Sequence, residues 1–214
     1  MAVRGRFITF EGTEGVGKST QMKNAAQTLE SLGIDYLVTR EPGGTPMAET
    51  IREVLLASRA ESVHEMTELL LMFAARAQHL HTRILPALDA GQWVLCDRFT
   101  DATFAYQGGG RGVSKERIAV LESLVQGDVR PDHVILLDAP VETGMSRAKH
   151  RGELDRFEQE DIEFFQRIRD TYLERATASP AQYHIVNAAL PLEQVSASVA
   201  ALLTALVKAP QQVG

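Results

Sequence analysis

The chain contains a single cysteine among its 214 residues, Cys96, so it cannot form an internal disulfide. Long hydrophobic runs are also missing: the longest purely apolar stretch is 69–75, whereas a membrane helix needs about 20 residues. The first twelve residues reach a glycine before any apolar segment long enough for a signal peptide. These absences favour a cytoplasmic protein in a reducing compartment and argue against a membrane partner.

Basic residues are outnumbered, with 22 Lys and Arg against 28 Asp and Glu and a formal net charge of −6. Nucleic-acid binding usually needs a basic surface, so the composition predicts no nucleic-acid partner. The remaining composition, 44% hydrophobic and 23% charged, is that of an ordinary globular protein. The length suits one domain, which we assign to residues 1–214 with a frayed tail over about 208–214.

Short β-rich segments alternate with longer segments of helical periodicity. The predicted strands are 7–11, 35–39, 93–96, 133–137 and 183–187. The predicted helices are 18–32, 67–89 with a kink at Pro86, one that begins after an N-cap at Ser114, 158–178 and 191–207. This alternation predicts an α/β fold, a five-stranded parallel sheet with helices on both faces. Two glycine-rich segments, 41–46 and 107–112, are interpreted as loops of a site.

A phosphate-binding loop is the most specific motif. Residues 12–19, GTEGVGKS, follow a predicted strand, precede a predicted helix and match G-x-x-x-x-G-K-[ST]. Glycines let backbone N–H groups converge on phosphate oxygens, and the helix N-terminus adds partial positive charge. In such loops the lysine, here Lys18, reaches the β- and γ-phosphates, and the hydroxyl, here Ser19, coordinates Mg²⁺. The chain is therefore predicted to bind a nucleoside triphosphate, ATP or GTP, with Mg²⁺.

Three classes of protein use such a loop: a GTPase switch, a motor ATPase and a small-molecule kinase. The guanine-reading NKxD motif of a GTPase does not occur. A kinase needs a second pocket, and Arg40 and Asp97-Arg98 follow predicted strands at the edge where ligands bind in open α/β sheets. Phe73 and Arg76 share one helix face. From the residues alone, Phe73 fits either a core or a ligand role. Arg76 and Arg98 each fit either a surface ion pair or a ligand contact.

A basic segment, 146–156, follows the fourth predicted strand. Arg147, Lys149, Arg151 and Arg156 lie in it, interleaved with acidic residues. It is either a solvated charged face or a mobile lid, hinged at Gly152, that brings positive charge to the transferred phosphoryl group.

Together these motifs resemble the bacterial-type thymidylate kinases, nucleoside monophosphate kinases of the P-loop superfamily. The resemblance is carried by FEGTEGVGKST, TREPGGT (39–45), LLLMFAARAQH (69–79), DRF followed by AYQGGGRG (105–112), LLDAP, and RGELDRFE (151–158). It implies a P-loop kinase fold with a short mobile lid at about 147–158, transfer of the γ-phosphoryl of ATP to dTMP giving dTDP and ADP, and a homodimer.

The resemblance also implies roles for individual residues. The ATP-binding residues would be Gly12, Thr13, Glu14, Gly15, Val16, Gly17, Lys18, Ser19, Thr20 and Arg147. Mg²⁺ would be held by Ser19 and Asp97. The dTMP-binding residues would be Glu14, Arg40, Pro42, Arg52, Phe73, Arg76, Arg98, Thr103, Tyr106 and Gln107. The catalytic group would comprise Lys18, Asp97, Arg98 and the lid arginines Arg151 and Arg156.

Within the acceptor set, Phe73 would stack on thymine and Arg76 would bond to a ring carbonyl, with Thr103 and Gln107 contacting the base. Tyr106 would crowd the 2′ position of the sugar.

Arg98 and Arg52 would hold the monophosphate, and Glu14 would face the 3′-hydroxyl. The phosphate loop has no basic residue at position 14, so the chain is similar to those members whose lid supplies the cation, here chiefly Arg151. Two alternatives stay open: a kinase for another nucleotide or a deoxynucleoside, and a non-catalytic ATP-binding switch.

Overall fold

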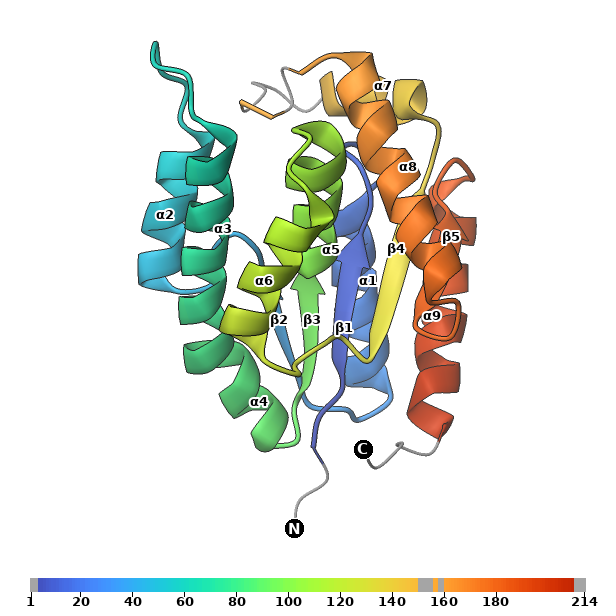
Figure 1. Ribbon diagram of the computed structural model, residues 1–214. Helices are drawn as coiled ribbons and strands as arrows, with labels where there is room; N and C mark the ends of the chain where they lie inside the picture. Colours follow the sequence, from blue (N-terminus) through green and yellow to red (C-terminus); the bar gives the residue numbers. More distant parts are fainter. Residues whose placement is uncertain (1–3, 150–155, 158–159, 210–214) are drawn as a thin grey trace.

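The computed structural model describes residues 4–149, 156–157 and 160–209 (Figure 1). Five parallel strands form one sheet in the order β2-β3-β1-β4-β5. The strands are β1 (Phe7–Glu11), β2 (Tyr36–Arg40), β3 (Trp93–Asp97), β4 (His133–Asp138) and β5 (Tyr183–Asn187). The predicted α/β fold is confirmed. Strands β2, β3 and β4 each end one residue later than predicted, on a charged side chain.

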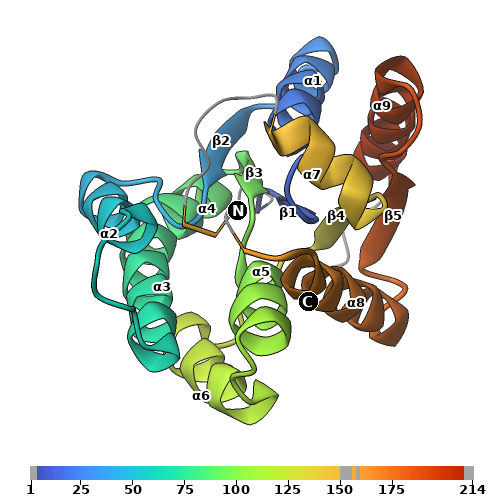
Figure 2. The same ribbon diagram turned by 90° about the horizontal axis from the view of Figure 1, so that it is seen from above.

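Helices cover both faces of the sheet, because its central strands are buried on both sides (Figure 2). On one face, α1 (Lys18–Ser31) and α9 (Leu192–Lys208) pack together over a core that includes Ile8, Phe10 and Ile135. The other face is covered by the π-helical segment η1 (Leu80–Ile84), α4 (Leu85–Asp89) and α8 (Ile162–Ala178).

Further helices on that side of the sheet, called here the outer helical layer, form the wall of the site. The layer contains α2 (Pro46–Leu56), α3 (Glu65–His79), α6 (Lys115–Gln126), α5 (Thr100–Thr103) and the π-helical segment η2 (Phe104–Gly110). At the carboxyl ends of the strands, α7 (Val141–Lys149) passes beside the phosphate loop (Figure 1). The two approach so closely that a Cβ on Gly15 would lie 1.8 Å from the carbonyl oxygen of Gly144.

Several predicted element boundaries were wrong for identifiable reasons. The predicted helix 67–89 is interrupted by η1 just before Pro86, which has no N–H for a regular helical bond. The predicted helix 158–178 begins at Ile162. Its N-cap is Asp161, whose carboxylate accepts a hydrogen bond from Phe164 N at 2.7 Å. The N-cap at Ser114 is confirmed.

The segment 107–112 is not an open loop. Residues up to Gly110 belong to η2, which packs on α8 so closely that a Cβ on Gly109 would lie 2.2 Å from the Thr171 hydroxyl. These glycines serve close packing. The sequence analysis did not predict helices α2 and α5. Among the helices of the described residues, none is long and apolar enough to cross a membrane.

Candidate active site

A cavity of ≈ 430 Å³ opens at the carboxyl edge of the sheet, between the phosphate loop, the ends of β2 and β3, and the outer helical layer. Most of the predicted site residues line it. They are Glu14, Gly15, Gly17, Lys18, Ser19, Thr20, Arg40, Pro42, Arg52, Arg76, Asp97, Arg98, Thr103, Tyr106, Gln107 and Arg147. The structure thus brings together the two sets of residues that were expected to bind a donor and an acceptor.

The phosphate loop joins β1 to α1, and two of its carbonyl groups bind the Lys18 ammonium. The Nζ of Lys18 donates to the carbonyl oxygens of Thr13 at 2.8 Å and Gly12 at 3.2 Å. Burial lowers the pKa of Lys18, and the nearby Arg98 lowers it further. Gly12, Thr13 and Val16 do not line the cavity; Val16 is a core residue. The first two contribute carbonyls that orient the lysine ammonium.

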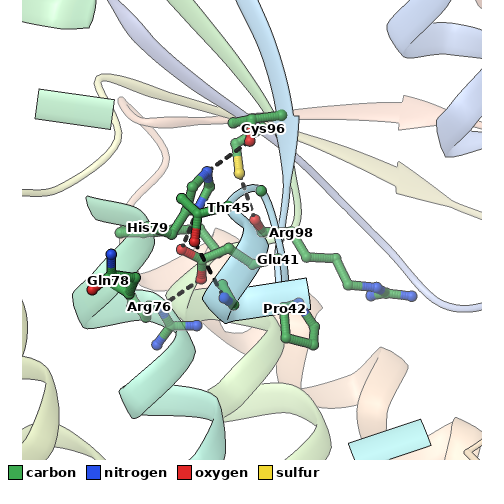
Figure 3. Close-up of polar contacts among 12 residues, drawn as sticks. Glu41, Pro42, Thr45, Arg76, Gln78, His79, Cys96 and Arg98 are labelled. Atoms are coloured by element: carbon green, nitrogen blue, oxygen red, sulfur yellow. Dashed lines mark hydrogen bonds and ion pairs between the residues drawn. The ribbon is translucent and has the colours of Figure 1, made fainter. Parts of the chain in front are cut away.

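Arg98 follows β3 in a left-handed backbone conformation, with φ 66°. For a residue with a side chain this conformation costs on the order of 1–3 kcal/mol, and neighbouring contacts must hold it. The Cys96 thiol donates to Arg98 O at 3.0 Å (Figure 3), and the next amide, Phe99 N, donates to Oε1 of Glu11 at 2.7 Å. A strained turn whose following peptide group is held by two hydrogen bonds is typical of a functional residue.

The guanidinium of Arg98 connects the phosphate loop to the opposite wall. Its Nη1 donates to Gly12 O at 2.8 Å and to the Tyr172 hydroxyl at 3.1 Å. Its Nη2 donates to Glu14 Oε1 at 2.6 Å and to the Tyr106 hydroxyl at 2.8 Å. Burial alone would lower the pKa of Arg98, but its anionic and phenolic neighbours raise it well above the usual value. Arg98 therefore stays cationic in the cavity.

Glu11 is a buried acid that the sequence analysis missed. Its Oε2 accepts from the Tyr172 hydroxyl at 2.8 Å, and its side chain is fully buried. Burial, followed by repulsion from Asp101, raises the pKa of Glu11 from 4.5 to about 8, although Arg98 opposes the shift. Its position at the end of a buried strand, immediately before the phosphate loop, was the available signal.

The wall of the cavity opposite the phosphate loop includes residues of α3, α5 and η2. Arg76 donates from Nε to Glu41 at 2.7 Å and from Nη2 to Thr103 at 2.9 Å, while its Nη1 is buried without a partner among the described residues. Gln107 donates to Glu68 at 2.8 Å. The sequence analysis assigned no role to either glutamate, because their contacts join residues far apart in the chain.

Phe73 is not placed as expected. It is 2% exposed, does not line the cavity and packs with Leu69, Phe104 and Ile118. The guanidinium carbon of Arg76 lies 4.8 Å from the centre of its ring. In this structure the Phe73 ring packs against the Arg76 guanidinium. Stacking on thymine would require the ring to become exposed to the cavity.

Two further arginines of the expected dTMP-binding set are Arg52 and Arg40. Arg52 donates to Pro42 O at 2.9 Å, and Arg40 pairs with Glu49 at 2.8 Å at the exposed rim. Both line the cavity. Arg147, which was expected to bind ATP, donates to Ala188 O in the loop after β5 at 2.9 Å.

The structure describes one of the two arginines that were expected in the lid. Arg151 lies outside the described residues. Arg156 does not line the cavity: its Nη2 pairs with Glu68 at 2.6 Å and its Nε donates to Leu55 O at 3.1 Å. Arg156 is therefore held against α2 and α3, and in this structure it does not face the phosphate loop.

The proposed magnesium ligands fit a hard cation. Asp97 Oδ1 is buried and has no hydrogen-bond partner among the described residues, and both Asp97 and Ser19 line the cavity. Within the same residues no group of three His, Cys, Asp or Glu forms a metal cage. Mg²⁺ keeps several water and phosphate ligands when it is bound, so Asp97 and Ser19 would be sufficient protein ligands for it.

Known proteins match the chain over nearly its full length. The family model described as "Thymidylate kinase" matches residues 10–199. A thymidylate kinase of Pseudomonas savastanoi pv. phaseolicola is 60% identical over 95% of this chain and 97% of its own. One from Teredinibacter turnerae is 56% identical over 94% and 98%. The crystal structure of thymidylate kinase from Ehrlichia chaffeensis superimposes with a TM-score of 0.76 at 33% identity, covering 94% of this chain and 99% of that one.

Proposed function

The chain belongs to the thymidylate kinase family and is an ATP-dependent nucleoside monophosphate kinase that phosphorylates dTMP; we propose that ATP and dTMP meet tail to tail in the cavity between the phosphate loop and η2. The reaction is ATP + dTMP → ADP + dTDP. The observation that carries the proposal is Arg98, whose guanidinium bonds to both the phosphate loop and the acceptor wall.

The donor occupies the phosphate-loop side. Backbone N–H groups of residues 12–17 and the N-terminus of α1 bind the phosphates, and Lys18 reaches the β- and γ-phosphoryl groups. Adenine lies between Arg147 and the loop that contains Ala188. The hydrogen bond from Arg147 to Ala188 O keeps α7 and this loop next to each other. Ser19 and Asp97 would hold Mg²⁺, which supplies neutralisation of the phosphate charge when bound.

The acceptor occupies the opposite side. Arg98 and Arg52 hold the dTMP phosphate, with Arg40 and Pro42 at the rim. Glu14 faces the 3′-hydroxyl, from its position beside Arg98.

Tyr106 restricts the 2′ side of the sugar, and Arg76, Thr103 and Gln107 contact the base. Phe73 holds Arg76 in place through its ring.

Catalysis here is mainly a matter of charge. A phosphate monoester has its second pKa near ~6, so the attacking oxygen is already ionised at neutral pH and needs no general base. The barrier is the approach of two anions. Lys18 and Arg98 lie within one cavity and offset that repulsion, and they stabilise the charge on the transferred phosphoryl group. Arg151 of the lid is the third cation in the proposal.

The proposed assembly is a homodimer through the outer helices. Leu70 on α3 is 52% exposed, and Val120 and Leu124 on α6 are 68% and 78% exposed. Helices α3 and α6 pack side by side, so these apolar side chains belong to neighbouring elements. Light scattering should give twice the monomer mass, and Leu124→Glu should shift it toward the monomer. We also propose a cytoplasmic location.

The test is ADP release by the purified protein with MgATP and dTMP, dUMP, dCMP, dAMP or thymidine in turn. We expect dTMP to give the highest kcat/KM, and Lys18→Met to abolish turnover with every acceptor. Higher activity with another monophosphate or with thymidine would favour a different nucleotide kinase. ATP binding with no acceptor-dependent ADP release would favour a switch.

A further inference from the structure

We propose that two buried glutamates, Glu41 and Glu68, fix the pattern of hydrogen-bond donors and acceptors that the cavity presents to a pyrimidine. They act as positioning residues for base selection, because each holds a side chain that lines the cavity. The inference rests on the proposed function, in which Arg76 and Gln107 contact the base.

Glu41 is immobilised by contacts on both of its oxygens (Figure 3). Its side chain is 4% exposed; Oε2 accepts from Arg76 Nε at 2.7 Å, and Oε1 accepts from His79 Nδ1 at 3.0 Å. The other ring nitrogen of His79 contacts the Thr39 hydroxyl at 2.6 Å. Gly44 leaves room for this arrangement, since a Cβ there would lie 2.4 Å from His79 Nε2. The loop after β2 is thus packed around Glu41 and His79, and Glu41 holds Arg76.

This arrangement engages two of the three guanidinium nitrogens of Arg76, a residue that lines the cavity. Nε and Nη2 are engaged by Glu41 and Thr103, whereas Nη1 is buried and has no partner in the part of the chain that is described. The guanidinium lies against two rings, 4.8 Å from the centre of Phe73 and 4.9 Å from that of Phe99. These contacts prevent it from swinging away, so Arg76 offers a fixed donor.

Glu68 determines which end of the Gln107 amide is available. Its side chain is 1% exposed, and its Oε1 accepts from Gln107 Nε2 at 2.8 Å. An ionised carboxylate can only accept, so it holds the amide nitrogen and leaves the amide oxygen as the end that can face a ligand. No hydrogen bond among the described residues engages that oxygen. Gln107 therefore offers a fixed acceptor.

One donor and one acceptor match a pyrimidine with a carbonyl at ring position 4 and an N–H at ring position 3. Thymine and uracil have this pattern. Cytosine reverses it, with an amino group at position 4 and an unprotonated nitrogen at position 3. A reversed base would leave buried polar groups unpaired, which is a strong source of discrimination. The two glutamates therefore select carbonyl pyrimidines without touching them.

The test compares kcat/KM for dTMP with kcat/KM for dCMP in Glu41→Gln and Glu68→Gln. The amide introduced at position 68 can donate to the Gln107 oxygen and turn the Gln107 amide around. We expect the dTMP-to-dCMP ratio to fall by about tenfold or more in each variant, the equivalent of one mispaired buried group. The KM for ATP should stay unchanged in Glu41→Gln.

Two controls separate this role from general damage. Asp132→Asn makes the same chemical change at the opposite edge of the sheet, where Asp132 accepts from Phe7 N at 2.6 Å, and should leave the ratio unchanged. Arg156→Gln removes another partner of Glu68 without touching Gln107. Whatever it does to kcat, it should leave the ratio unchanged.

The inference is overturned if both glutamine variants fold with unaltered melting temperature and keep the wild-type ratio, or if Asp132→Asn lowers the ratio equally. If the glutamine variants do not fold, a structure of the unmodified protein with dTMP decides. Arg76 Nη1 should lie at the position-4 carbonyl and Gln107 Oε1 at the position-3 N–H; a base that contacts neither overturns the inference. Failure of the unmodified protein to phosphorylate dTMP would instead contradict the proposed function.

Discussion

Replacing Arg98 by lysine, alanine and glycine separates its charge, its hydrogen-bonding geometry and its backbone conformation. Lysine keeps the charge but loses the planar fork that bonds to the phosphate loop on one side and to Glu14 and Tyr106 on the other. Losing one charge-assisted hydrogen bond costs about 1.5–3 kcal/mol, so Arg98→Lys should lower kcat/KM for dTMP by about tenfold to a hundredfold. Arg98→Ala removes the cation as well and should lower kcat/KM by about 10³ or more.

Glycine tests the backbone separately. Because φ at position 98 is 66°, Arg98→Gly relieves a strain that Arg98→Ala retains, of about 1 kcal/mol. The glycine variant should melt about 2–4 °C above the alanine variant while being just as inactive. Steady-state kinetics and thermal unfolding measure the two effects. Wild-type kcat/KM in Arg98→Lys, or a glycine variant less stable than the alanine variant, would refute this reasoning.

Three further changes test other parts of the site. Phe73→Ala should lower the free energy of unfolding, measured in urea, by about 3–5 kcal/mol and should raise KM for dTMP. Phe73→Leu should keep most of the wild-type stability. A Phe73→Ala variant of wild-type stability would show that Phe73 is not a core residue. Because the folded-state pKa of Glu11 is raised from 4.5 to about 8, its contribution to stability is present below about pH 4.5 and is lost as pH rises toward 8, at up to about 1.4 kcal/mol per pH unit. Glu11→Gln should therefore flatten the decline in melting temperature between pH 5 and pH 8, and an unchanged slope would contradict the raised pKa. Arg147→Ala should raise KM for ATP and leave KM for dTMP unchanged, as judged by varying each substrate at saturation of the other; an effect on dTMP alone would misplace the adenine.

Local patterns were enough to predict that Lys18 and Ser19 would lie together at the cavity. Lys18 and Ser19 belong to a contiguous motif between a strand and a helix, so their positions follow from short-range geometry. Arg98 and Asp97 were predicted because residues that follow neighbouring parallel strands converge at one edge of the sheet, and β3 pairs directly with β1.

The acceptor wall depended on long-range packing that no local pattern shows. Phe73 lies on a helix face that is apolar in the sequence, and the burial of its ring depends on α6 and η2 packing against it. Glu41 and Glu68 each bond to partners more than 30 positions away in the chain. The glycines of η2 suggested a loop, and only contact with α8 explains why Gly109 is small.

The most direct test of the shared cavity is a crystal structure with dTMP and a non-hydrolysable ATP analogue bound together. The account predicts the γ-phosphate of the analogue at Lys18 and the dTMP phosphate at the Arg98 guanidinium, with the pyrimidine against Arg76 and Gln107. A dTMP molecule bound outside this cavity, or within it but with Arg98 turned away from its phosphate, would contradict the account.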